Sequence, residues 1–155
     1  MSTVTGRRGT TEQETDVPIP AAEVRAEVED LLARYALGYD EGDLELIAEC
    51  FTADAVMSLE VGGEEPAGPF RGREAIVELI RTTARSQSDR RRHVLTNLVL
   101  QHEGGRARAR CYLTLFAVAD GALRAVTTGD YLCELHRTEQ GWRLTRLRVR
   151  LDLPY

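Results

Sequence analysis

The sequence contains no lysine, and all 20 basic residues among its 155 are arginine. This absence excludes a lysine Schiff base, a lysine-anchored pyridoxal phosphate and a P-loop, which requires Gly-Lys-Ser/Thr. Cysteines are also few, and the three that occur (Cys50, Cys111 and Cys133) are too scattered for a disulfide framework. Their scarcity fits a reduced, cytoplasmic location.

Long apolar runs and an excess of basic charge are missing as well. No run approaches the roughly 18 residues of a membrane span, and the first residues lack the apolar segment of a signal peptide, so no membrane partner is expected. The net charge of -5 argues against nucleic acid as a partner, because phosphate binding needs a basic surface. With 43% hydrophobic residues, the chain is long enough for one domain.

The remaining patterns divide the chain into a tail, three helices and a run of strands. Residues 1–18 are polar and aperiodic, which predicts a disordered tail ahead of a domain over 19–155. Apolar residues at helical spacing from Val24 to Tyr39 predict a long helix that begins near Pro20. Gly42 is expected to end this helix, and Asp43 to cap a short second helix over 44–51.

The rest of the chain predicts an α+β fold with helices on one face of a curved sheet. We expect a strand over 52–61, a loop over 62–72, a third helix over 74–84, and strands over 93–101, 107–119, 123–136 and 142–153. The apolar parity of the last strand changes near Thr145 and Arg146, which predicts a bulge. Both faces of the 93–101 strand are largely apolar, so a homodimer through the outer sheet face is expected.

Two polar positions stand out as candidates for chemistry. The three histidines lack ligand-like spacing with Cys, Asp or Glu, so we expect no metal site. Asp40 lies near a helix C-terminus, where the dipole disfavours a carboxylate, and His93 shares a strand face with Asn97. Alone, each could be a solvated turn aspartate or an ordinary core histidine. Within hydrogen-bond reach, Asp40 would orient the imidazole and leave its other nitrogen as a general base.

Five segments, taken in order, resemble the SnoaL-like branch of the NTF2-like superfamily: 35–43, 50–55, 70–76, 93–97 and 141–144. The resemblance covers about residues 20–153 and is nearest to scytalone dehydratase-like and dehydrochlorinase-like members. It implies a cone-shaped barrel of three N-terminal helices on a curved antiparallel or mixed sheet that encloses a pocket, commonly in a homodimer and without a cofactor. It also implies that Asp40 and His93 form a catalytic dyad.

The chain departs from both of these relatives, which limits what the resemblance implies about the substrate. The stretch 109–117 lacks the second pocket histidine of scytalone dehydratase, and the lysine of the dehydrochlorinase is absent. The expected function is therefore a cofactor-independent dehydratase or cyclase that removes a C–H proton from a hydrophobic, polyketide-type small molecule. The expected substrate-binding and supporting residues are mainly aromatic or apolar: Tyr35, Tyr39, Phe51, Met57, Asn97, Phe116, Tyr131, Trp142 and Arg146.

Two non-catalytic alternatives remain open at the level of sequence. The chain could be a ligand-binding module of the same fold, which would have no reason to keep Asp40 and His93 together. It could also be a structural small subunit of a ring-hydroxylating dioxygenase, which should co-purify with an iron-containing large chain.

Overall fold

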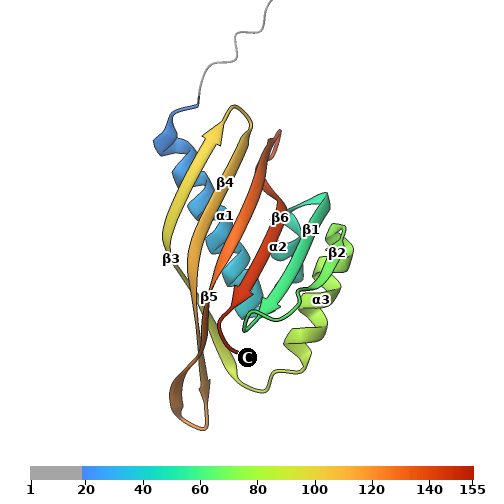
Figure 1. The fold of residues 1–155 in the computed structure, drawn as a ribbon, viewed down its shortest axis with the longest axis vertical. Helices are drawn as coiled ribbons and strands as arrows, with labels where there is room; N and C mark the ends of the chain where they lie inside the picture. Colours follow the sequence, from blue (N-terminus) through green and yellow to red (C-terminus); the bar gives the residue numbers. More distant parts are fainter. Residues whose placement is uncertain (1–18) are drawn as a thin grey trace, which may run out of the picture.

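The computed structural model describes residues 19–155, so the predicted tail lies outside the described residues. Three helices cover one face of a curved six-stranded sheet, which confirms the α+β prediction (Figure 1). The strand order is β2-β1-β6-β5-β4-β3, so the sheet is open and has β2 and β3 as its edges. The elements are α1 (Ala21–Glu41), α2 (Leu44–Glu49), β1 (Phe51–Val61), β2 (Ala67–Arg71), α3 (Arg73–Arg85), β3 (Arg90–Glu103), β4 (Arg106–Ala119), β5 (Ala122–Thr138) and β6 (Gly141–Leu151).

The junction between α1 and α2 is fixed by two caps, as the sequence predicts. Gly42 adopts the left-handed conformation (φ 71°), and the N–H of Asp43 donates to the carbonyl of Gly38 at 2.8 Å. The carboxylate of Asp43 accepts from the N–H of Leu46 at 3.0 Å and starts α2. The last turn of α1, which carries Asp40, is therefore held in place from both sides.

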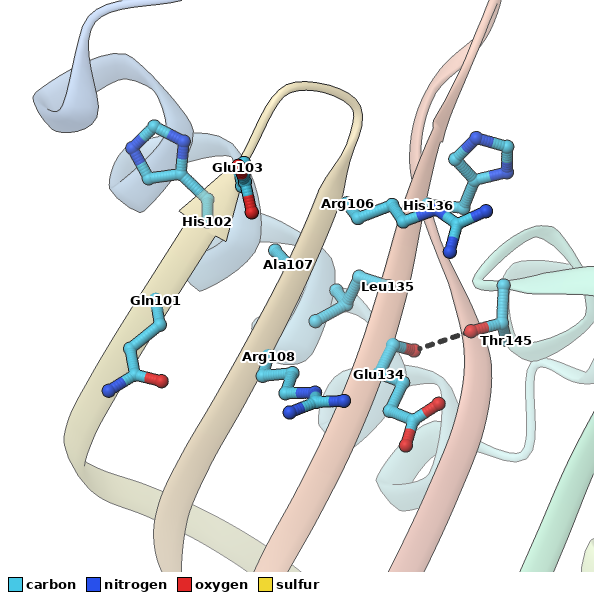
Figure 2. A pocket seen from close by; sticks show the side chains of 10 residues that line it. All are labelled: Gln101, His102, Glu103, Arg106, Ala107, Arg108, Glu134, Leu135, His136 and Thr145. Carbon is cyan, nitrogen blue, oxygen red and sulfur yellow. Dashed lines mark hydrogen bonds between the residues drawn. The ribbon is translucent and has the colours of Figure 1, made fainter.

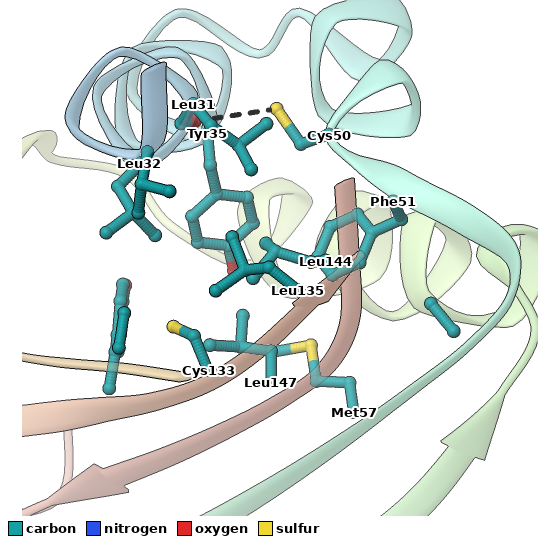
Figure 3. Packing of buried hydrophobic residues seen from close by; sticks show 14 of the residues in the cluster. Leu31, Leu32, Tyr35, Cys50, Phe51, Met57, Cys133, Leu135, Leu144 and Leu147 are labelled. Atoms are coloured by element: carbon teal, nitrogen blue, oxygen red, sulfur yellow. Dashed lines mark hydrogen bonds between the residues drawn. The ribbon is translucent and has the colours of Figure 1, made fainter. Parts of the chain in front are cut away.

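The core lies between α1 and the inner face of the sheet. Tyr35 of α1 is 1% exposed and meets the rings of Phe51 and Tyr131 edge-on, at centroid distances of 5.6 and 6.0 Å. Figure 3 shows Tyr35 pointing from the helix toward side chains of the strands, among them Leu135 and Leu144. Edge-to-face contacts of buried rings add stability beyond the apolar area that they remove from water.

The predicted bulge in β6 is confirmed. Leu144 pairs with Leu135 and Arg146 pairs with Glu134, which leaves Thr145 without a partner on β5. The extra residue resets the alternation, so that Leu144 and then Leu147 both reach the core.

One strand was not predicted. The segment 62–72 was expected to be a loop, but residues 67–71 form β2 and pair with β1. Proline carries no N–H and is normally confined to edge strands, and β2, which contains Pro69, is an edge strand. A high content of glycine and proline, as in the segment 62–72, is therefore compatible with an edge strand as well as with turns.

A second bulge, at Asn97, changes which residues of β3 face the core. Thr96 pairs with Tyr112 and Val99 pairs with Arg110, so β3 has one extra residue between these pairs. Asn97 adopts a φ of 58°, a left-handed conformation that asparagine tolerates better than most residues. The expectation that Asn97 shares the face of His93 is therefore wrong, because the pleat is interrupted between them.

The outer face of the sheet carries an ion-pair network around Asp130. Its carboxylate side chain is 8% exposed and accepts hydrogen bonds from Arg150 Nε at 2.7 Å, from Arg150 Nη2, and from Arg110 Nε at 2.8 Å. The pKa of Asp130 is held below its usual value, chiefly by the hydrogen bonds from Arg150 and also by the hydrogen bond from Arg110. Burial acts in the opposite direction. The network therefore stabilises the folded chain only while Asp130 is ionised.

Replacing Asp130 with asparagine should lower the free energy of unfolding by about 1 kcal/mol at neutral pH. Because the folded-state pKa is lowered, the wild-type advantage is present above the unfolded pKa of about 4 and is lost as the pH falls through the folded value. Urea unfolding at pH 7 and pH 3 measures this difference. Asp54→Asn, at an exposed position, is the control, and an Asp130→Asn deficit of equal size at both pH values would contradict the prediction.

Candidate functional site

Asp40 and His93 meet between the end of α1 and the beginning of β3. The Nδ1 atom of His93 lies 2.6 Å from Oδ1 of Asp40. The backbone N–H of His93 also donates to both carboxylate oxygens, at 3.2 and 3.0 Å. The side chains are 8% and 7% exposed, respectively. The sequence alone could not give the distance between Asp40 and His93, and the structure shows that the two side chains are joined by a direct hydrogen bond.

This contact fixes how the imidazole can act. The carboxylate accepts hydrogen bonds, so Nδ1 of His93 is the donor and Nε2 is left as the acceptor in the neutral ring. Within residues 19–155, no side chain or backbone group hydrogen-bonds to Nε2. The ring of Tyr39 packs against the imidazole at a centroid distance of 4.6 Å and restricts its rotation. The histidine is therefore oriented, with one nitrogen available to a ligand.

His93 borders a small interior cavity of about 40 Å³ between the helices and the sheet. The wall is almost entirely aromatic or apolar: Tyr35, Tyr39, Met57, Leu59, Leu79, Ile80, Thr83, Leu113, Leu115, Tyr131, Val149, Leu151 and Tyr155. Burial raises the pKa of the Tyr39 hydroxyl to about 12, so this group is a neutral hydrogen-bond donor at neutral pH. A base, a neutral donor and an apolar wall are thus brought together.

An open groove between α1 and β3 borders the other side of the pair. Its volume is about 700 Å³, and Leu32, Leu95 and Asn97 line it together with Asp40 and His93. Asp40 borders the groove but not the cavity, whereas His93 borders both. The imidazole therefore extends from the carboxylate toward the interior of the fold.

The structure gathers only part of the predicted substrate-binding set around this cavity. Tyr35, Tyr39, Met57 and Tyr131 line it beside His93. Phe51 and Trp142 are buried in the core but do not border it. Asn97 is exposed in the groove.

Two predicted pocket residues lie on the opposite face of the sheet. The inner side of β4 is formed by the alternating buried residues Cys111, Leu113 and Leu115, so Phe116 points outward. Arg146 also faces outward; its side chain is 58% exposed and lies 3.7 Å from Glu134. Placing either residue in the pocket was wrong, because strand parity puts both on the outer face.

Sequence reasoning missed two residues that line the cavity and one that lies beside it. Thr83 of α3 and Tyr155, in the segment after β6, both line it. Arg91 lies against the ring of Tyr155, with its guanidinium carbon 5.6 Å from the ring centroid. The signal for Arg91 was available, because residues two apart on a strand share a face and Arg91 precedes His93 by that spacing.

Another hollow, of about 560 Å³, lies over the far ends of β3 to β6. Figure 2 shows its mixed charged lining, with the rings of His102 and His136 on different strands and pointing away from each other. The hydroxyl of Thr145 donates to the carbonyl of Glu134 there at 3.1 Å. The hollow has no acid–base pair comparable to that of Asp40 and His93.

Two further observations concern residues 19–155 alone. No cluster of three or more His, Cys, Asp or Glu side chains in this part of the chain has a geometry that could hold a metal ion. None of its helices combines the length and apolarity needed to cross a membrane.

Comparison with solved structures defines the class of fold. An NTF2-like protein with a cystatin-like fold from Novosphingobium aromaticivorans is 31% identical, with a TM-score of 0.72 over 84% of this chain and 82% of that chain. A candidate aromatic ring hydroxylase from the same organism is 31% identical, with a TM-score of 0.71 over 88% and 94%. A Catenulispora acidiphila protein in complex with S-DNPA is 28% identical, with a TM-score of 0.73 over 84% and 95%.

The family assignment follows from the sequence match. The model of the SnoaL-like domain matches residues 20–148, and the chain belongs to this family, which includes polyketide cyclases and dehydratases. No curated protein matches the chain.

Proposed function

We propose that the protein is a cofactor-independent dehydratase or cyclase that acts on a hydrophobic, polyketide-type small molecule. The observation that carries the proposal is the 2.6 Å contact between Nδ1 of His93 and Asp40 at the edge of an apolar cavity. A binding module would gain little from an oriented histidine with a free nitrogen. Family membership supports the reaction class, because cyclases and dehydratases occur in the family.

The mechanism is general base catalysis by His93. Nε2 removes a proton from a carbon next to a carbonyl, and Asp40 stabilises the imidazolium that forms. The neutral hydroxyl of Tyr39, which packs on the imidazole, donates a hydrogen bond to the developing enolate oxygen. Expulsion of a β-hydroxyl, with the proton returned from His93, gives a dehydration. Attack of the enolate carbon on a second carbonyl of the same molecule gives a cyclisation, in which the alkoxide that forms takes the proton back from His93.

The simplest test measures proton abstraction without a natural substrate. The protein should accelerate exchange of the carbonyl-adjacent protons of 2-tetralone in deuterated water, which proton NMR follows directly. This ketone offers a planar apolar body and an acidic C–H, the two properties that the site is proposed to recognise. Exchange no faster than with heat-inactivated protein at millimolar ketone would contradict a general base that ligands can reach.

The second candidate, left open by the sequence, is a structural small subunit of a ring-hydroxylating dioxygenase. The chain is similar over most of its length to a candidate aromatic ring hydroxylase. If the chain is a structural subunit of such an assembly, it should co-purify with an iron-containing large chain from its own host. In that case the exchange assay should show no catalysis.

The outer sheet face is proposed to form a homodimer. Exposed apolar side chains gather on β3, β4 and β5, among them Val99 (63% exposed), Tyr112 (51%) and Leu123 (70%). A second copy of the chain would remove these exposed apolar side chains from water. Light scattering after gel filtration at micromolar concentration should give twice the 17.3 kDa mass of the chain. Tyr112→Arg should give the monomer mass, whereas Leu37→Arg on α1 should not; a monomeric wild type would contradict the proposal.

A further inference from the structure

The cavity beside His93 is too small for the molecule that it is proposed to bind. Its volume is about 40 Å³, which is room for a few water molecules. Sites for small organic molecules typically measure about 300 to 1,000 Å³. A wall of the cavity must therefore move when a ligand enters, and the wall that moves will decide what the enlarged site contains.

Among the wall residues, Tyr155 alone lies outside the helices and strands. The segment after β6 is pinned as far as Leu153, whose carbonyl accepts from the hydroxyl of Thr127 at 2.9 Å and whose N–H donates back at 3.1 Å. The hydroxyl of Thr128 donates to the carboxylate of Asp152 at 2.6 Å, and the N–H of Asp152 donates to the carbonyl of Thr128 at 2.8 Å. Tyr155 lies beyond these bonds, is 40% exposed, and still borders the cavity. The end of the chain marked C in Figure 1 lies close to the segment that joins α3 to β3.

The guanidinium of Arg91 lies against the ring of Tyr155 and has one N–H donor group without a partner among residues 19–155. Arg91 shares the inner face of β3 with His93, and its side chain is 11% exposed. Its Nε donates to Asp89 at 2.7 Å, and Asp89 is held in turn by Arg124 at 3.0 Å. Nη1 of Arg91, however, is buried and has no hydrogen-bond partner among residues 19–155. A buried donor on a charged group is costly unless something pairs with it.

We propose that Arg91 is a specificity-determining residue that pairs with an anionic oxygen of the ligand when the ligand displaces the ring of Tyr155. The site would then take a planar apolar molecule that carries a carboxylate or phenolate. Its apolar body would lie among the tyrosines beside His93, and its oxygen would reach Nη1 of Arg91. The arginine is already oriented by Asp89, so little side-chain freedom is lost on binding. This inference rests on the proposed function only in taking the cavity beside His93 as the ligand site.

The test compares two probes that differ in charge but share a ring system. Isothermal titration calorimetry at pH 7.5 would measure the binding of 2-naphthoate and of neutral 2-naphthalenemethanol. The wild type should bind naphthoate about tenfold more tightly than the alcohol, as expected for one charge-assisted hydrogen bond. Arg91→Gln should abolish this preference. Arg92→Gln is the matched control, because the adjacent Arg92 is 40% exposed and pairs with Glu41 at 3.4 Å; it should keep the preference.

Tyr155→Ala tests the displacement and leaves Arg91 intact. Removing the ring should tighten the binding of both probes by about fivefold or more, because the ligand no longer competes with it. Equal affinity for the two probes in this variant would overturn the role of Arg91, even if Arg91→Gln failed to fold. Unchanged affinities in Tyr155→Ala would overturn the displacement. Binding is measured without turnover, so these outcomes are independent of the exchange assay with 2-tetralone.

Discussion

Replacing His93 with alanine should lower kcat for the exchange of 2-tetralone protons by roughly 10² to 10⁴, the usual contribution of a positioned general base. The imidazole is the only side chain that joins the carboxylate of Asp40 to the interior cavity within residues 19–155. Asp40→Asn should also lower kcat, because an amide can donate to Nδ1 and so stabilise the wrong tautomer. NMR exchange rates at saturating ketone measure both effects.

A control variant separates catalysis from folding. His102→Ala removes another histidine of β3 that lies outside the cavity, and its kcat should match the wild type. If either dyad variant exchanges protons at nearly the wild-type rate, Asp40 and His93 are not the catalytic pair.

The second large effect is expected at Gly129, where two strands approach too closely for a side chain. A Cβ atom there would overlap the carbonyl oxygen of Arg150 and lie 3.0 Å from Cα of Leu151, so the backbone of β6 would have to shift. Gly129→Ala should therefore lower the free energy of unfolding by about 2 to 3 kcal/mol, and Tm by about 6 to 10 °C.

Calorimetry or circular dichroism measures the change at Gly129, with Gly105→Ala as the control. At Gly105 the nearest atom to an added methyl group would be 3.8 Å away, which is ordinary contact. That substitution should change the free energy of unfolding by less than about 0.5 kcal/mol. A Gly129→Ala protein as stable as the control would show that β5 and β6 can separate without loss of packing.

The elements that the sequence predicts well are those with a strong local signal. The helical spacing from Val24 to Tyr39 and the caps at Gly42 and Asp43 are local, and α1 and α2 were predicted accordingly. The Thr145 bulge was also visible, because a change of apolar parity records it directly. The bulge at Asn97 left no such trace, since both faces of β3 are apolar and a shift of one residue moves one apolar residue into the place of another.

The sequence indicated Asp40 and His93 as candidate residues, but its local patterns did not show that the two side chains meet in space. Helix and strand periodicity put Asp40 at the end of α1 and His93 near the beginning of β3, but their contact depends on α1 crossing the sheet edge, which no local pattern encodes. The family resemblance supplied that pairing. Aromatic character alone does not place Phe116 in the pocket, because its neighbours Leu115 and Ala117 occupy the buried positions of β4.

The parallel pairing of β1 with β6 sets the order in which the molecule can be completed. Phe51 pairs with Leu144 and Val61 pairs with Leu151, so the partners are separated by most of the domain. During synthesis, β1 can form its hairpin with β2 but remains without its second neighbour until the last strand has left the ribosome. Joining such distant segments has a high loop-closure cost, so this step should limit the folding rate. A chain that stops before β6 would leave the backbone N–H and C=O groups along one edge of β1 unpaired and should aggregate.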